Sequence, residues 1–240
     1  MTVSVIKNEN ICAVTESVLL SAKKFQQSNQ QRGVLPPIFI IVPDRATLNA
    51  EKILTRDACL LNTRVLTFSM LYHVLAGDDP QRVLDKTSAV LYMWRAINDV
   101  RANLTYFGRS ADQYAFGEKM FNTINQLHSC LADFNNLEKN AREAVTKRKM
   151  HDIALIRARY AELTSGHIDG GGELDWLIKN IPQNESVKMT HFYIAGFDYL
   201  SIQRAEVVRL LMKYGASFTV GSQSGSEFEG FLNETRFNLQ

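Results

Sequence analysis

The sequence feature that most limits the possible folds is an uninterrupted apolar run at residues 38–42. It reads Ile-Phe-Ile-Ile-Val and lies between Pro-Pro and Pro-Asp. A strand with one face in water alternates apolar and polar residues, whereas a strand covered on both faces does not. Because the run is also short and bounded by prolines, it predicts a buried strand of a parallel α/β sheet.

The segments around this run alternate between strand and helix patterns. The expected strands are residues 2–6, 38–42 and 64–68, and the expected helices are residues 11–25, 46–58 and 69–76, the last with Ser69 as its N-cap. Short links between alternating elements favour parallel strands joined by helical crossovers. We therefore predict that residues 1–78 form the first part of a sheet domain.

The pattern changes at about residue 79, where long segments with apolar residues at helical spacing begin. A strand pattern returns at residues 191–197, followed by a helix at 201–215 and a strand at 216–221. We predict an all-helical insertion at residues 79–187 within one sheet domain, to which residues 188–240 return.

Composition excludes several functional classes. The chain has 27 basic and 25 acidic residues, so contact with nucleic acid would have to come from a local patch. Its three cysteines and five histidines lack the spacing of a metal site or a disulfide framework. The N-terminus does not resemble a signal peptide, and no apolar run approaches the roughly 20 residues of a membrane helix. We expect a cytoplasmic chain without metal, cofactor or membrane contact.

The positions that would carry nucleotide chemistry hold unsuitable residues. A phosphate loop after the first strand needs glycines, a lysine and a Ser or Thr. The residues in that place are Lys7, Asn8, Glu9 and Asn10. An acidic pair for magnesium would follow the strand near residue 194, but Ala195 and Gly196 stand there, with Asp198 two residues further on. We therefore expect no nucleotide binding and no catalytic residue.

Several stretches together resemble a known family. The stretches VPDRATLNAEKIL, RVLTFSMLYHVL, KMHDIALIRARYAEL and YIAGFDYLSIQRAEVVRLLM resemble, in this order, segments of AddB and RexB. These are the B subunits of bacterial ATP-dependent helicase–deoxyribonucleases, and RexB of lactic-acid bacteria is the nearest resemblance. The order of elements is also similar to the first domain of a superfamily-one helicase. The resemblance implies a degenerate RecA-like (P-loop NTPase-like) sheet with an all-helical insertion.

The resemblance also implies a function. In that family the B subunit keeps a helicase shape without the motor and forms a heterodimer with an AddA- or RexA-type helicase–nuclease. The complex processes DNA ends in double-strand break repair and recombination, and the B subunit takes part in recognising the hot-spot Chi. Magnesium and an iron–sulfur cluster belong to a C-terminal nuclease domain that has no counterpart here. The implied role is a non-catalytic DNA-binding and scaffolding region of a longer subunit.

Candidate DNA contacts follow from the sheet and from the resemblance. Ligands bind at the carboxyl ends of the strands in an open α/β sheet. Proteins hold single-stranded DNA by stacking its bases on aromatic side chains and by placing polar or basic groups at its phosphates. The candidates are Arg45, Thr47, Phe68, Ser69, Met70, His73, Phe197 and Tyr199. Arg45 and Met70 stand where the family often has Gln and Arg, so base readout at these positions is expected to differ.

Each candidate also has a structural interpretation. Phe68 and Phe197 could be core residues, Arg45 a solvated side chain, and Thr47 a helix cap. The basic cluster at residues 147–149 is more typical of a solvated helix face than of a phosphate site. Two other functions stay open: a structural module that docks the motor subunit without DNA affinity, and a small nucleotide-dependent α/β enzyme.

Overall fold

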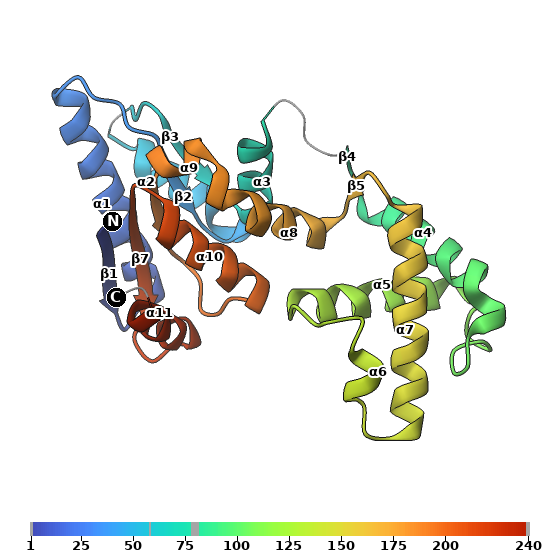
Figure 1. The fold of residues 1–240 in the computed structure, drawn as a ribbon. Coiled ribbons are helices and arrows are strands. Elements are labelled where there is room, and N and C mark those ends of the chain that lie inside the picture. The colour runs from blue at the N-terminus through green and yellow to red at the C-terminus, as the bar shows by residue number, and fades with distance from the viewer. Residues whose placement is uncertain (1, 58, 78–81, 239–240) are drawn as a thin grey trace. The chain divides into compact units, whose positions relative to one another are not determined.

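A computed structural model describes residues 2–57, 59–77 and 82–238 of the chain (Figure 1). The chain divides into two compact units, residues 1–78 with 174–240 and residues 79–173. The predicted helix end at Ala58 and the predicted boundary at 78/79 lie outside the described residues. The unit that contains the sheet resumes at residue 174, whereas the sequence pattern places this return at residue 188.

A five-stranded sheet forms the centre of the first unit. Its strands are β1 (Thr2–Asn8), β2 (Ile38–Ile41), β3 (Thr63–Leu66), β6 (His191–Ile194) and β7 (Ser217–Gln223). They lie in the order β1-β7-β6-β2-β3, and every pairing is parallel. The sheet confirms the α/β prediction, and all of residues 38–42 are buried, as the apolar run requires.

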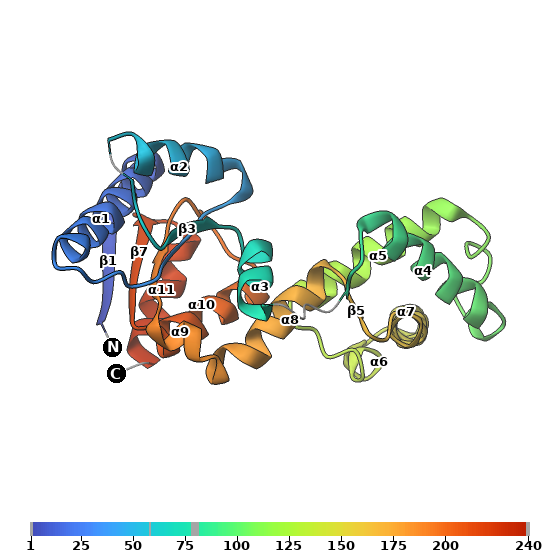
Figure 2. The ribbon, with the colours of Figure 1, turned by 90° about the horizontal axis from the view of Figure 1, so that it is seen from above.

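Helices cover both faces of this sheet. The helices of the unit are α1 (Ile11–Gln31), α2 (Thr47–Thr55), α3 (Phe68–Ala76), α8 (Gly170–Asn180, which begins in the second unit), α9 (Glu185–Met189), α10 (Ile202–Tyr214) and α11 (Glu227–Asn238), with the short 3-10 turns η1 (Asp44–Ala46) and η3 (Ile181–Gln183). The connections through α1 and α2 cross the sheet in one direction, and the connection through α10 crosses it in the other. Because such crossovers are right-handed, they lie on opposite faces, as Figure 2 shows for α1 and α2 against α9 and α10.

The start of α3 differs from the sequence-based prediction. The third strand ends at Leu66 rather than at residue 68, and Phe68 is the first residue of the helix. Thr67 is the N-cap, not Ser69, since its side-chain oxygen accepts a hydrogen bond from the Met70 amide at 3.2 Å. This shift of two residues decides which side chains reach the end of the sheet.

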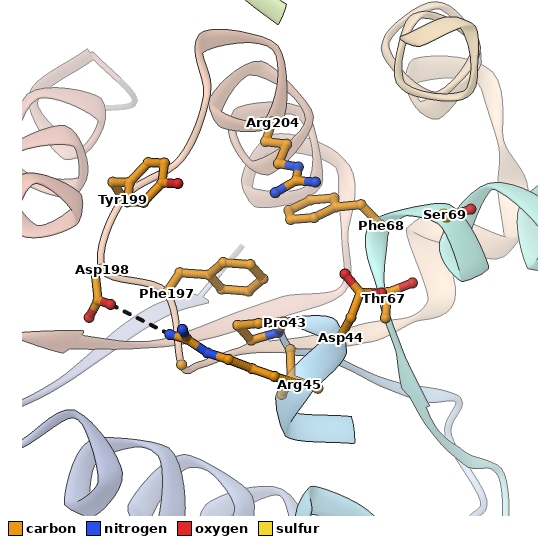
Figure 3. A pocket seen from close by; sticks show the side chains of 12 residues that line it. Pro43, Asp44, Arg45, Thr67, Phe68, Ser69, Phe197, Asp198, Tyr199 and Arg204 are labelled. Atoms are coloured by element: carbon orange, nitrogen blue, oxygen red, sulfur yellow. Dashed lines mark ion pairs between the residues drawn. The ribbon is translucent and has the colours of Figure 1, made fainter. Parts of the chain in front are cut away.

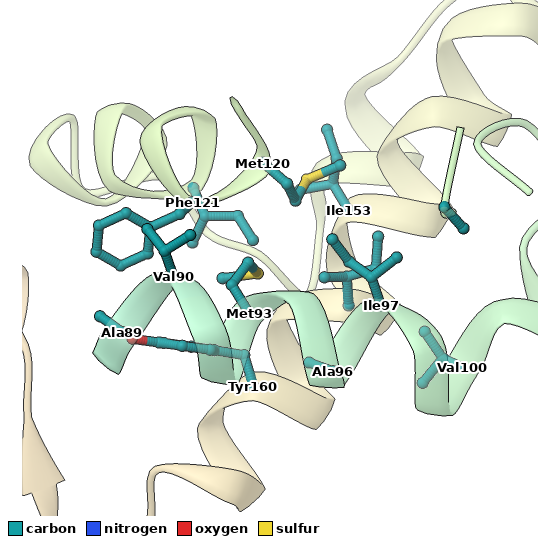
Figure 4. Packing of buried hydrophobic residues seen from close by; sticks show 13 residues of the cluster. Ala89, Val90, Met93, Ala96, Ile97, Val100, Met120, Phe121, Ile153 and Tyr160 are labelled. Carbon is teal, nitrogen blue, oxygen red and sulfur yellow. The ribbon is translucent and has the colours of Figure 1, made fainter. Parts of the chain in front are cut away.

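The second unit is built around three long helices. Its elements are β4 (Arg82–Val83), α4 (Lys86–Val100), η2 (Arg101–Asn103), α5 (Tyr114–Ser129), α6 (Leu137–Asn140), α7 (Ala144–Leu163) and β5 (His167–Ile168). Met93, Ile97, Met120 and Ile153 are among the buried residues where α4, α5 and α7 meet (Figure 4). The unit is not all-helical as predicted, because β4 and β5 form a short parallel pair.

A buried carboxylate fixes one segment of this unit. Asp152 on α7 accepts hydrogen bonds from the Thr105 amide and hydroxyl and from the Tyr106 and Phe107 amides, all at 2.8–3.0 Å. Burial alone would raise the pKa of Asp152, but these hydrogen bonds outweigh it and hold the pKa below the usual value. The four donors therefore favour an ionised carboxylate inside the protein.

Within the residues that the structure describes, none of the helices has the length and apolar character needed to cross a membrane.

Candidate functional site

A pocket of about 380 Å³ opens at the carboxyl end of the sheet (Figure 3). Three segments line it: residues 42–45 after β2, residues 67–69 after β3, and residues 196–199 after β6, together with Arg204 of α10. These segments are far apart in the sequence and meet only because β2, β3 and β6 are parallel neighbours in the sheet.

The topology explains why the pocket forms at this place. β2 and β6 are adjacent, yet the chain leaves them in opposite directions, through α2 and through α10. Connections that diverge from neighbouring strands leave a crevice at the carboxyl ends, which is where open α/β sheets bind ligands. The pocket lies at this switch point.

Two phenyl rings border the pocket. Phe68 and Phe197 are only 5% and 6% exposed, and their ring centroids lie 5.6 Å apart at a tilt of 58°. Gly196 places Phe197 there through a left-handed backbone (φ +84°), and a Cβ at Gly196 would approach Pro43 Cδ to 3.1 Å. The rings therefore serve as packing and as pocket wall at once, so both interpretations made from the sequence apply.

Charged groups of both signs surround the rings. Arg45 Nη2 lies 3.6 Å from Asp198 Oδ2, and the two side chains are 78% and 51% exposed. A solvated ion pair of this kind contributes little to stability. The Arg204 guanidinium lies 5.6 Å from the centre of the Phe68 ring. Tyr199, 69% exposed, stands beside the pocket with its ring available to a ligand (Figure 3).

The structure brings together some of the predicted contact residues and separates others. Arg45, Phe68, Ser69, Phe197 and Tyr199 all line the pocket. The other three predicted residues do not.

Those three residues lie elsewhere for local reasons. The Thr47 hydroxyl donates to the Asp44 carbonyl oxygen at 2.9 Å and so stabilises the start of α2. Met70 lines a separate groove of about 580 Å³ beside β3, and His73 packs its ring edge-on against Tyr72. Since α3 begins at Phe68, only its first two residues reach the pocket.

Arg204 is the pocket residue that the sequence reasoning missed. Ser201 is the N-cap of α10 and accepts a hydrogen bond from the Arg204 amide at 3.3 Å, which puts Arg204 in the first turn. The positive end of the helix dipole disfavours a cation at that place. An arginine in the first turn of the helix that follows β6 and Phe197 was the signal that could have marked it.

The connection after β1, where a phosphate loop would lie, is short and its side chains are engaged locally. Only Glu9 and Asn10 separate β1 from α1, and the Asn10 side chain caps the helix by accepting from the Cys12 and Ala13 amides at 2.8 and 3.4 Å. A phosphate loop needs a longer, glycine-rich segment whose amides are free for phosphate oxygens. The Asn8 side chain is also engaged locally, because it accepts a hydrogen bond from the Asn10 amide.

The lysine next to this connection is already paired. Lys7 Nζ lies 2.6 Å from Glu229 Oε1, and the Gly225 amide donates to Glu229 Oε2 at 2.7 Å. The hydrogen bond from Lys7, followed by that from Gly225, lowers the pKa of Glu229. An internal carboxylate thus takes the place at this lysine that a phosphate would need.

The positions expected for a magnesium-binding acidic pair are closed to carboxylates as well. Ala195 is fully buried in the core, and Gly196 has the positive φ described above. A carboxylate at 195 would be buried without a partner, and one at 196 would be strained. Across the described part of the chain, no group of three His, Cys, Asp or Glu side chains is placed to hold a metal ion.

The fold and the pocket define a parallel α/β protein with its candidate ligand site at the topological switch point of the sheet. A protein-family model described as "ADDB, N-terminal" matches residues 17–234, and the chain belongs to this family. It is similar to the B subunit of the ATP-dependent helicase/deoxyribonuclease of Staphylococcus aureus strains JH9 and Newman, each 28% identical over 196 residues. The match covers 77% of this chain and 17% of each relative, so the chain spans about a sixth of their length. The predicted nearness to lactic-acid bacteria stays a prediction.

Proposed function

We propose that this chain is the non-catalytic, DNA-binding and scaffolding N-terminal region of the B subunit of a cytoplasmic ATP-dependent helicase–nuclease. The complex would process DNA ends in double-strand break repair and homologous recombination. Family membership and the relatives' name support this role. The parallel sheet, interrupted by a helical unit between β3 and β6, supports a degenerate RecA-like domain.

The pocket at the carboxyl end of the sheet is the observation that carries the DNA-binding proposal. It combines aromatic rings with exposed arginines, and single strands bind to such combinations through stacking and phosphate contacts. A cavity of about 380 Å³ suits one nucleotide and excludes a duplex. We propose that the pocket scans single-stranded DNA, with a Chi preference altered by Arg45. Met70, the other position that differs from the family, would act from the separate groove beside β3.

On this proposal the region works without nucleotide, metal or other cofactor of its own. The two-residue connection after β1 and the buried Ala195 support ATP-independent binding. Motor activity would come from an AddA- or RexA-type partner subunit. Nuclease activity with magnesium and an iron–sulfur cluster would belong to the partner and to the C-terminal part of the full subunit.

Fluorescence anisotropy with a fork-tailed DNA duplex tests the proposal, at low and moderate salt and with and without Mg-ATP. We expect salt-sensitive binding that ATP leaves unchanged. Tyr199→Ala should weaken binding at least about fivefold, because stacking is worth about 1–3 kcal/mol per base. Tyr114→Ala, which removes a tyrosine 52% exposed in the other unit, is the matched control. ATP-dependent binding would show that the Lys7–Asn10 connection holds phosphate after all.

A module that only docks the motor subunit is the alternative, and it predicts assembly without DNA affinity. The double variant Arg45→Ala/Phe68→Ala separates the two functions when it is co-purified with the partner subunit. Loss of DNA binding with intact assembly excludes the scaffold-only role. Absence of DNA binding by both proteins favours it, whereas equal DNA binding by both refutes the pocket as the DNA site. Circular dichroism checks that the loss of the buried Phe68 ring leaves the fold intact.

A further inference from the structure

The positive charge of the pocket is unevenly compensated. Arg45 has the Asp198 carboxylate at 3.6 Å, so this pair presents little net charge to a ligand. Arg204 forms no ion pair among the residues that the structure describes, and its guanidinium carbon lies over the Phe68 ring, 5.6 Å from the ring centre. Its cationic head therefore stands at the pocket wall without an internal anion to neutralise it.

The position of Arg204 on α10 makes this charge still less favourable in the free protein. Ser201 caps the helix, and Arg204 follows in the first turn, where the helix dipole is positive. An anion bound in the pocket would be attracted by both the guanidinium and the helix end. Among the described residues no carboxylate pairs with Arg204, so the free protein gains no comparable stabilisation from an arginine at this position.

We infer that Arg204 is the phosphate-binding residue of the pocket and holds one phosphodiester group of single-stranded DNA. The base of the same nucleotide contacts the rings of Phe68 and Phe197. This inference rests on the proposed DNA-binding function and names the residue that neutralises the strand. In Figure 3 Arg204 lies beside the Phe68 ring, on the other side of Phe197 from Arg45 and Asp198, and all of these residues line the pocket. A nucleotide in the cavity therefore meets a ring and a cation that are already in contact.

Arginine suits this task better than lysine for a geometric reason. A flat guanidinium can lie over an aromatic ring and still direct two parallel N–H groups at phosphate oxygens. The ring contact restricts the side chain before the ligand arrives, so less freedom is lost on binding. An ammonium group would keep the charge but lose the planar contact with Phe68.

The test measures the salt dependence of binding to a labelled oligothymidylate about 15 nucleotides long. Each phosphate contact to a single strand adds about 0.7 to the slope of log affinity against log salt. We expect Arg204→Gln to lower the slope by about 0.7, with affinity reduced about eightfold near 50 mM salt and about threefold near 200 mM. Arg204→Lys should restore the slope while binding stays weaker than in the wild type.

Lys213→Gln is the matched control, because it removes one positive charge from the last turn of the same helix. It should leave the slope within experimental error. An unchanged slope in Arg204→Gln, with Tyr199→Ala still impaired, overturns the role of Arg204 and leaves the proposed function standing. Equal losses in Arg204→Gln and Lys213→Gln would reduce the effect to net charge and also overturn it. Absence of binding by the wild type overturns both proposals together.

Discussion

Replacing Asp152 by asparagine tests how the helical unit, residues 79–173, holds its shape. Asp152 is fully buried and accepts four hydrogen bonds from residues 105–107, more than forty positions earlier in the chain. Asparagine keeps the size but has one acceptor oxygen, so its NH₂ group faces two of the donors. Two hydrogen bonds to a charged acceptor are lost, and each is worth at least about 1.5 kcal/mol.

The expected loss is therefore about 3 kcal/mol in the free energy of unfolding of this unit. For a unit of this size the loss corresponds to a fall in Tm of roughly 10–20 °C, which calorimetry measures. If residues 105–107 open by themselves, the Tyr106 and Phe107 amides should exchange with deuterium about 100-fold faster. Hydrogen exchange with mass spectrometry measures this second effect.

The pH dependence gives a second signature of the same carboxylate. The pKa of Asp152 is lower in the folded chain than in the unfolded chain, where a free aspartate titrates near about 3.9. Its stabilisation is therefore complete above that value and is lost as the pH falls below about 4 towards the folded pKa. Asp152→Asn should flatten this part of the stability profile.

Asp112→Asn is the matched control, since Asp112 is exposed and pairs with Arg101 at the surface of the same unit. It should change Tm little, because surface ion pairs contribute little to stability. If Asp152→Asn lowered Tm no more than Asp112→Asn, the buried hydrogen bonds would not be what holds residues 105–107, and the reasoning would fail.

Three further predictions concern the pocket. Asp198→Asn should release Arg45 from its ion pair and so raise DNA affinity, measured by anisotropy, about two- to fivefold. This gain should disappear when Arg45 is also replaced by glutamine. Asp44→Asn is the control, since any gain in affinity from it should persist in the Arg45→Gln background. Gly196→Ala should lower the free energy of unfolding by about 1–3 kcal/mol in a denaturant titration, because φ is +84° and a proline ring lies against the position. Thr67→Ala should cost about 1 kcal/mol in the same titration by removing the cap of α3.

The sheet could be predicted from the sequence because its signals are local. Residues 38–42 are apolar without a break, and only a strand buried on both faces needs that pattern. The expectation that Lys7 and Glu9 form no phosphate loop also rests on adjacent residues, and it stays a prediction. The short β4–β5 pair was missed because two-residue strands leave no periodic pattern.

The candidate site was only partly predictable because it depends on helix starts and on distant segments. Thr67 rather than Ser69 caps α3, and this choice turns Met70 and His73 away from the pocket while Phe68 stays on it. Arg204 enters only because the fold brings the first turn of α10 against Phe68, which follows β3 and is distant in the sequence. The spacing of nearby residues in the sequence indicates neither fact.

The carboxyl end of the sheet is divided into a closed half and an open half, and this division bears on how such a chain could work. After β1, Lys7 is paired with Glu229 and Asn10 caps α1, so the chain's own groups use the contacts that a nucleotide would need. After β2, β3 and β6, the pocket with Phe68 and Arg204 is open. A motor domain couples a bound nucleotide to a bound DNA strand through one sheet. In this chain only the half of the sheet edge proposed to bind DNA is open. On the proposed function, the affinity of this region for DNA therefore depends on the DNA strand alone and not on a bound nucleotide. Any movement along the DNA must be driven by another subunit.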